Sequence, residues 1–120
     1  MLSTNGFLNS RQLRLHYAAH GAAFGARSAA EYQEIADRFL REPKGTAAEE
    51  CKRSHGDIVR FDPSTDEFGV LDARKVIRTF FKPIPCASVP VAERSKMKQT
   101  GRCHDYATNL LYFQEECKKW

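Results

Sequence analysis

The stretch GDIVRFDPSTDEFGVLDARKVIRTFFKP, residues 56–83, decides the fold of this chain. Apolar and polar side chains alternate through residues 57–62, 67–71 and 76–82, and this is the period of a half-buried β-strand. The two intervening segments, 63–66 and 72–75, hold Pro, Asp and Ser, which favour tight turns. Three strands joined by short turns predict an antiparallel meander that ends at proline 83.

Two helices are predicted ahead of this meander. Asn9 or Ser10 caps the first helix, which stops at Gly21. Ser28 and Glu31 are predicted to form a capping box for the second helix. The Ser28 hydroxyl would accept the amide proton of Glu31, and the Glu31 carboxylate would accept the amide proton of Ser28. The second helix carries an apolar stripe at helical spacing, made of Tyr32, Ile35, Ala36, Phe39 and Leu40. The expected fold is α+β, with N-terminal helices packed on a twisted antiparallel β-sheet.

The other segments have weaker signals. Residues 46–53 are predicted to form a short exposed helix, and residues 84–104 show no clear period but contain a basic run. Residues 109–117 fit either one helix or a strand followed by a helical turn. Ser, Thr, Asn and Gly are frequent in residues 1–10, which predicts a linker-like start. Residues 11–120 are then expected to form a single domain.

Charge and cysteine content narrow the functional classes. Lys and Arg total 19 and Asp and Glu total 15, so the net charge of +4 suits a polyanionic partner. No stretch approaches the roughly 20 apolar residues of a membrane span, and the first residues do not resemble a signal peptide. The cysteines at positions 51, 86, 103 and 117 lack the close spacing of zinc ligands. We therefore expect no metal, no cofactor, no membrane contact and reduced thiols typical of an intracellular compartment.

The segment HYAAHGAAFG, residues 16–25, places His16 and His20 on one face of the first helix. One interpretation is structural, with one ring packed and the other at the helix end. The other is proton transfer, because the pKa of imidazole lies near 6.5. Residues 17–19 contain no glutamate, so the HExxH pattern of zinc proteases is absent.

The third strand, VIRTFFKP at residues 76–83, mixes cations with aromatic side chains. Strict alternation predicts two faces, with Arg78, Phe80 and Lys82 on one and Ile77, Thr79 and Phe81 on the other. Its charges could simply lie in solvent. Alternatively, Arg78 and Lys82 could bind phosphate, and Thr79 could donate a hydrogen bond to a substrate.

Together these groups suit the cleavage of RNA without a metal. In that reaction a base removes the proton of the 2′-OH, cations stabilise the charge on the phosphoryl oxygens, and an acid protonates the leaving 5′ oxygen. Histidine can act as base or acid. DNA lacks the 2′-OH, so these groups would select RNA.

Three segments carry a resemblance to a known group: HYAAHGAAFGARSAAEYQEIADRFL, then GDIVRFDPSTDEFGVLDARKVIRTFFKP, then NLLYFQEEC. They resemble the C-terminal toxin domains of contact-dependent growth inhibition and other polymorphic toxin effectors, in the barnase–EndoU–colicin–RelE ribonuclease group. The resemblance covers roughly residues 11–83 and 109–117. It implies a metal-independent endoribonuclease that acts on RNA, commonly tRNA. It also implies a cognate immunity protein and a larger secreted or cell-surface effector that delivers the domain to the cytoplasm of a target cell.

The resemblance also implies site residues. The family's functional positions match His16, His20, Arg78 and Thr79. The predicted substrate contacts are Lys82, Phe81, Tyr112 and His104. Relatives often have a tyrosine in the aromatic pair where this chain has Phe80 and Phe81, so Tyr112 or Tyr106 would have to supply such a hydroxyl.

Two other functions stay open from the sequence. The chain could be an RNA-binding module without catalysis, or a basic immunity or adaptor protein that docks an acidic partner. Only the enzyme requires histidine and cation to converge within a few ångströms. The distance between the helix histidines and the strand cations therefore distinguishes the enzyme from the two alternatives.

Overall fold

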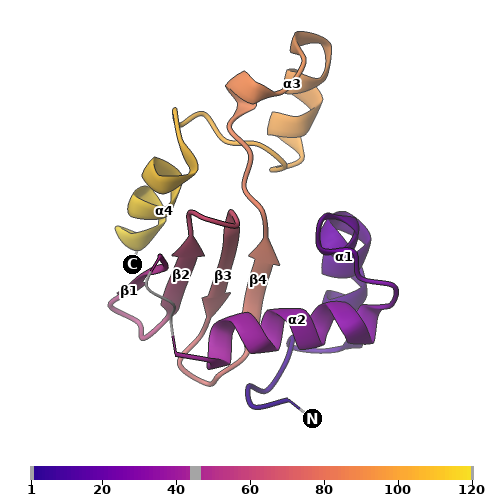
Figure 1. Ribbon diagram of the computed structural model, residues 1–120, viewed down its shortest axis with the longest axis vertical. Helices are drawn as coiled ribbons and strands as arrows, with labels where there is room; N and C mark the ends of the chain where they lie inside the picture. The colour runs from indigo at the N-terminus through magenta and orange to yellow at the C-terminus, as the bar shows by residue number, and fades with distance from the viewer. Residues whose placement is uncertain (1, 44–46, 120) are drawn as a thin grey trace.

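The computed structural model describes residues 2–43 and 47–119. Within these ranges the fold is α+β, with four α-helices and a four-stranded antiparallel sheet (Figure 1). The helices are α1 (Ser10–His20), α2 (Ala29–Arg41), α3 (Val91–Gln99) and α4 (Asn109–Cys117), with the short 3-10 helices η1 (Gly21–Phe24) and η2 (Cys86–Ser88). The strands are β1 (Glu49–Lys52), β2 (Ile58–Asp62), β3 (Glu67–Leu71) and β4 (Ile77–Phe81).

The predicted meander of three strands is confirmed. The sheet order is β1-β2-β3-β4, and each strand pairs antiparallel with the next. Side-chain bonds to the backbone stabilise both turns. The Asp62 carboxylate accepts the amide proton of Ser64 at 2.9 Å, and the Asp72 carboxylate accepts those of Arg74 and Val76 at 2.9 and 3.0 Å.

The helix expected at residues 46–53 is wrong. Residue 46 lies outside the described residues, but Glu49–Lys52 form β1 and pair with β2. A cross-strand ion pair supports this pairing, since Glu50 lies directly opposite Arg60 and their side chains are 2.7 Å apart. Arg60 also donates hydrogen bonds to the carbonyls of Phe39 and Glu42, which links the end of α2 to the sheet.

Both N-terminal helices begin at the predicted caps. The Asn9 side chain accepts the amide proton of Gln12, and Ser28 Oγ accepts that of Glu31. The reciprocal bond of the predicted capping box differs. The Glu31 carboxylate accepts the amide proton of Arg27 at 3.1 Å instead of that of Ser28.

One face of the sheet is covered by α2. The predicted apolar stripe faces the sheet, with Tyr32, Ala36 and Leu40 buried. The Tyr32 hydroxyl donates to the carbonyl oxygen of Phe80. Gly69 permits this close packing, because a Cβ there would lie 3.0 Å from a methyl carbon of Leu40.

The opposite face of the sheet is covered by α4. Residues 109–117 form one helix, so the strand alternative is wrong. Phe113 is buried against a cluster made of Val59, Phe61, Phe68 and Val70. Arg53 adds a polar link, since its side chain donates to the carbonyl oxygen of Glu116 at 2.8 Å. The two helices α2 and α4 thus bury opposite faces of the same sheet (Figure 1).

The four cysteines form two disulfides, Cys51–Cys117 and Cys86–Cys103, so the prediction of reduced thiols is wrong. The first joins β1 to the end of α4. The second lies in the segment that connects β4 to α4. Spacing along the chain does not show which cysteines meet, because the pairing depends on the tertiary fold.

The linker-like start predicted for residues 1–10 is also wrong for the described residues 2–10. Thr4 and Phe7 are buried. The Asp37 carboxylate accepts hydrogen bonds from the backbone amides of Ser3 and Thr4, and Phe7 forms a bridge with Ile77 at the outer edge of β4. This segment therefore places α1 beside β4.

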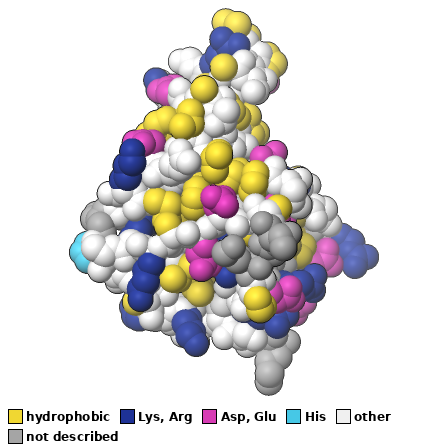
Figure 2. Space-filling view, turned by 60° about the vertical axis from the view of Figure 1, so that its left-hand side comes forward, with side chains coloured by type: hydrophobic (Ala, Val, Ile, Leu, Met, Phe, Trp, Pro, Cys, Tyr) yellow, Lys and Arg dark blue, Asp and Glu magenta, His cyan; other side chains and the backbone are white. Residues whose placement is uncertain are grey.

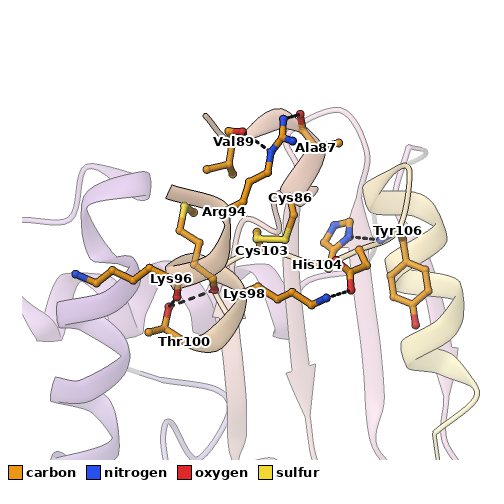
Figure 3. The surroundings of a disulfide bond; sticks show 12 residues. Cys86, Ala87, Val89, Arg94, Lys96, Lys98, Thr100, Cys103, His104 and Tyr106 are labelled. Carbon is orange, nitrogen blue, oxygen red and sulfur yellow. Dashed lines mark hydrogen bonds and ion pairs between the residues drawn. A yellow bond between two sulfur atoms is a disulfide. The ribbon is translucent and has the colours of Figure 1, made fainter. Parts of the chain in front are cut away.

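Residues 84–104 form a small unit that we call the α3 lobe. In Figure 1 it stands apart from the sheet, beyond the C-terminal end of β4. Its base is closed by the Cys86–Cys103 disulfide and by hydrogen bonds from Cys86 N to His104 O and from His104 N to Ile84 O. Its interior is small, with Val89 and both cysteines buried. Arg94 donates to the carbonyls of Val89 and Ala87, as Figure 3 shows.

Candidate functional site

The histidines of α1 both lie on the side of the helix that faces β4. The ring of His20 stacks on Phe81 with centroids 5.1 Å apart, and the ring of His16 lies 5.0 Å from that of Phe7. The two imidazoles are 6.2 Å apart. Gly21 ends the helix, where a Cβ would collide with the ring of Tyr17 at 2.4 Å. Helix α1 therefore directs two proton-exchanging groups toward the edge strand.

Partial burial changes the acid–base behaviour of both imidazoles. Burial, followed by the charges of His16 and Arg102, lowers the pKa of His20 to about 4. Burial also lowers the pKa of His16 below its ordinary value, and the charge of Arg78 adds to this. Both rings are therefore neutral near pH 7 and can accept a proton. His16 Nδ1 is buried and has no hydrogen-bond partner within the described part of the chain.

Strand β4 does not alternate as predicted. Leu71 pairs with Ile77 and Val70 with Thr79, so Arg78 is the extra residue of a β-bulge. As a result Ile77 faces α2 together with Phe80, and not the side of Thr79. The predicted two-face assignment of this strand is thus wrong at its beginning.

The bulge brings Arg78 to an exposed position between two hollows. The smaller, of about 160 Å³, is shared with His16 and Gln12. The larger, of about 510 Å³, is shared with Thr79 and is lined further by Arg53, His55, Asp57, Val70, Asp72 and Glu116. The Thr79 hydroxyl makes no hydrogen bond within the residues that the structure describes, so it is available to a ligand in this groove.

A second group of predicted residues meets at the C-terminal end of β4. A groove of about 220 Å³ between α1 and the α3 lobe is lined by His20, Phe81 and Lys82. Its other walls are Ala19, Ala23, Ile84, Met97 and Arg102. The Lys82 ammonium lies 5.4 Å from the ring centroid of Phe24. Arg102 is a further cation that sequence analysis did not single out, and its only signal was its place in a basic irregular segment.

Tyr112 and His104 adjoin this groove through Phe81 and Arg102. The rings of His104 and Tyr112 stack at 4.7 Å. His104 Nδ1 accepts the amide proton of Tyr106 at 3.2 Å, so its proton is on Nε2, which donates to Asn109 Oδ1 at 2.8 Å. With both ring nitrogens bonded inside the protein, His104 contributes a stacked ring and not a proton-transfer group.

The predicted residues therefore form two neighbouring clusters. One holds His16, Arg78 and Thr79, and the other holds His20, Phe81 and Lys82 beside Tyr112 and His104. The first cluster also contains Gln12, and the second also contains Arg102. The two histidine rings connect the clusters along α1.

The α4 side of the molecule has a different character. Figure 2 turns this side forward and shows hydrophobic side chains in the middle with Asp and Glu among them, while Lys and Arg lie mostly around the margin. Mixed charge gives a polyanion little reason to bind here. The cations that converge with the histidines are on the other flank, between α1 and β4.

Searches for related proteins find no match to a protein-family model and no curated protein of similar sequence. Among the described residues, no cluster of His, Cys, Asp and Glu is arranged to hold a metal ion. No helix within the same residues is long and apolar enough to cross a bilayer.

Proposed function

We propose that this chain is a ribonuclease toxin domain that cleaves RNA without a metal ion, with tRNA as its first candidate substrate. The observation that carries this proposal is the convergence of two neutral imidazoles on α1 with the cations of β4 and the α3 lobe. A pure RNA-binding surface needs the cations but has no need of partly buried imidazoles beside them.

The first step is removal of the 2′-OH proton. His20 suits this role, because a neutral imidazole has a free lone pair and the ring is held in place by its stack on Phe81. The 2′ oxygen then forms a bond to phosphorus while the bond from phosphorus to the 5′ oxygen breaks. The products are a 2′,3′-cyclic phosphate and a free 5′-OH.

Cations stabilise the negative charge that builds up on the phosphoryl oxygens. Arg78 adjoins His16, and Lys82 and Arg102 adjoin His20, so each imidazole has a phosphate-binding group next to it. The Thr79 hydroxyl, in the groove that it shares with Arg78, would position one oxygen by hydrogen bonding.

The leaving 5′ oxygen must receive a proton. His16 suits this role in the complex, because a bound phosphate anion raises the pKa of a neighbouring imidazole and offsets the effect of burial. His16 and His20 would then act as acid and base on opposite sides of one phosphate.

Digestion of total cellular RNA in the presence of excess chelator tests this function. We expect discrete cleavage, with new 5′-OH ends that sequencing maps to a limited set of RNAs. A substrate carrying 2′-deoxyribose at the cut position should stay intact, since the nucleophile is missing.

Cleavage that stops with chelator and returns with a divalent ion would overturn this mechanism. Binding of RNA without any cleavage would instead support the non-catalytic RNA-binding module.

The same proposal includes delivery by a larger secreted or cell-surface effector, action in the cytoplasm of the target cell, and a small immunity protein. Two disulfides support passage through an oxidising environment. The exposed Lys96 and Lys98 of the α3 lobe suit an acidic patch on the immunity protein. Expression of this chain alone should arrest bacterial growth, and normal growth at high soluble yield would contradict this part of the proposal.

A further inference from the structure

The groove between α1 and the α3 lobe combines an apolar wall with cations at its rim. Phe81, Ile84 and Met97 supply the apolar surface, and Lys82 and Arg102 supply the charges. Its volume of about 220 Å³ is below the roughly 300 to 1,000 Å³ of sites for drug-sized molecules. It is therefore suited to one planar group with an attached anion.

We infer that this groove is a specificity pocket that holds one unstacked nucleotide of an unpaired RNA segment, with the base against Phe81, Ile84 and Met97 and the phosphate at Lys82 and Arg102. This inference rests on the proposed function and adds to it the class of RNA that is cut. Bases inside a duplex are stacked on both sides and cannot enter such a groove, whereas unpaired bases can turn out and pack on protein side chains.

The neighbouring rings extend this surface in one direction. Phe81 lies 6.3 Å from Tyr112, Tyr112 stacks on His104 at 4.7 Å, and His104 lies 5.8 Å from the exposed ring of Tyr106. An RNA strand that leaves the groove past Phe81 would therefore meet further aromatic rings. The exposed Tyr106 ring offers a second base a stacking surface.

The α3 lobe determines the shape of the groove. Ile84 and Arg102 lie on the two chain segments that the Cys86–Cys103 disulfide joins, and Met97 packs against the same disulfide. Figure 3 shows this disulfide at the base of the lobe, next to the segment of His104. The segment that the resemblance leaves uncovered thus forms the wall that selects the nucleotide.

Two adjacent alanines of α1 provide a matched test. Ala18 and Ala19 are both exposed, but only Ala19 lines the groove. Ala19→Trp should fill the groove, and Ala18→Trp should leave it open. The probe is a fluorescent mixed-sequence 2′-O-methyl RNA, which binds but cannot be cleaved, either single-stranded or as a blunt duplex.

We expect the parent and Ala18→Trp to bind the single strand more tightly than the duplex. Ala19→Trp should bind the single strand about 5- to 150-fold more weakly, the range for loss of one stacked base, with unchanged affinity for the duplex. If Ala19→Trp does not melt like the parent, the exposed Arg102→Glu variant replaces it, with Arg14→Glu on the outer side of α1 as its control.

If the parent cleaves RNA, two results overturn this inference alone. In one, Ala19→Trp binds the single strand as tightly as the parent does. In the other, the parent binds the duplex as tightly as the single strand. If the parent neither binds the single strand nor cleaves total RNA, the proposed function fails as well. Equal losses in Ala18→Trp and Ala19→Trp would also overturn the pocket, since only one of them lines it.

Discussion

Replacing His20 with alanine is expected to lower the rate of RNA cleavage about 10²- to 10⁴-fold, the usual loss when a positioned general base is removed. The ring lies on Phe81 at the surface of α1, so the fold should survive. Single-turnover cleavage of a defined RNA, with circular dichroism to monitor folding, measures both effects. A variant that melts like the parent and cuts RNA at the parental rate would remove His20 from the mechanism.

The same experiment with Arg78→Ala has a charge-matched control on the chain. Arg78 and His16 line the same hollow. Arg14 is exposed on α1 and lines none of the hollows described for the site. Each substitution removes one positive charge. Only Arg78→Ala should lose about 10²- to 10³-fold in rate, because it alone removes a group that stabilises the developing charge. Equal effects would indicate general attraction of RNA.

Acid stability provides an independent check on the state of His20. The unfolded imidazole takes up a proton near pH 6.5, but the folded one does so only near pH 4. The unfolded chain therefore binds more protons in this interval, and the free energy of unfolding falls as the pH drops from about 6.5 to about 4. Urea titrations at several pH values should show a smaller drop in the free energy of unfolding for His20→Ala than for the parent. The drop that remains is the contribution of His16.

Removal of the Cys51–Cys117 disulfide is expected to have the largest effect on stability. It closes a loop with a sequence separation of 66 residues. A chain-entropy estimate gives about 4 kcal/mol for a loop of this length, and measured effects are often smaller. The Cys51→Ala/Cys117→Ala variant should therefore unfold at clearly lower urea concentration than the parent.

The second disulfide is the natural control for this experiment. Cys86–Cys103 closes a separation of only 17 residues and lies in the α3 lobe, away from the sheet. Its double alanine variant should lose less global stability, although the lobe itself should become more sensitive to proteases. Thiol labelling of the unfolded parent gives a direct test, and four reactive thiols without a reductant would contradict both bonds.

Much of the fold could be predicted because local chemistry agrees with the final structure. The meander is marked by period-2 alternation and by Asp side chains that bond their own turns, and α2 is marked by Ser28 and an apolar stripe. Each of these signals acts within a few residues. In each case the local preference agrees with the final fold.

The features that were missed depend on distant parts of the chain. β1 reads Glu-Glu-Cys-Lys and has no apolar alternation, so the sequence does not mark it as a strand. It becomes one by pairing along its whole length with β2, and the Glu50–Arg60 ion pair and the Cys51–Cys117 disulfide add to this pairing. The N-terminal residues have linker composition but meet Asp37 and the edge of β4.

The candidate site was predictable in its residue types but not in its geometry. The spacing of His16, His20 and the β4 cations left both a structural and a functional interpretation open, and the resemblance then marked these positions as functional. The bulge at Arg78 depends on the register with β3, and the role of Arg102 depends on the α3 lobe. The sequence predicted His104 as a substrate contact, but it did not show that both ring nitrogens bond within the protein, to Asn109 and to the amide of Tyr106.

The walls of the groove between α1 and the α3 lobe come from both halves of the chain. Ala19 and His20 precede the sheet, while Met97 and Arg102 follow it. A ribosome has made all four strands before it reaches the second wall, so the growing chain carries no groove during most of its synthesis. A break between β3 and β4 would likewise separate the α1 histidines from Arg78, Lys82 and Arg102 along the chain, but the Cys51–Cys117 disulfide would still join the two fragments.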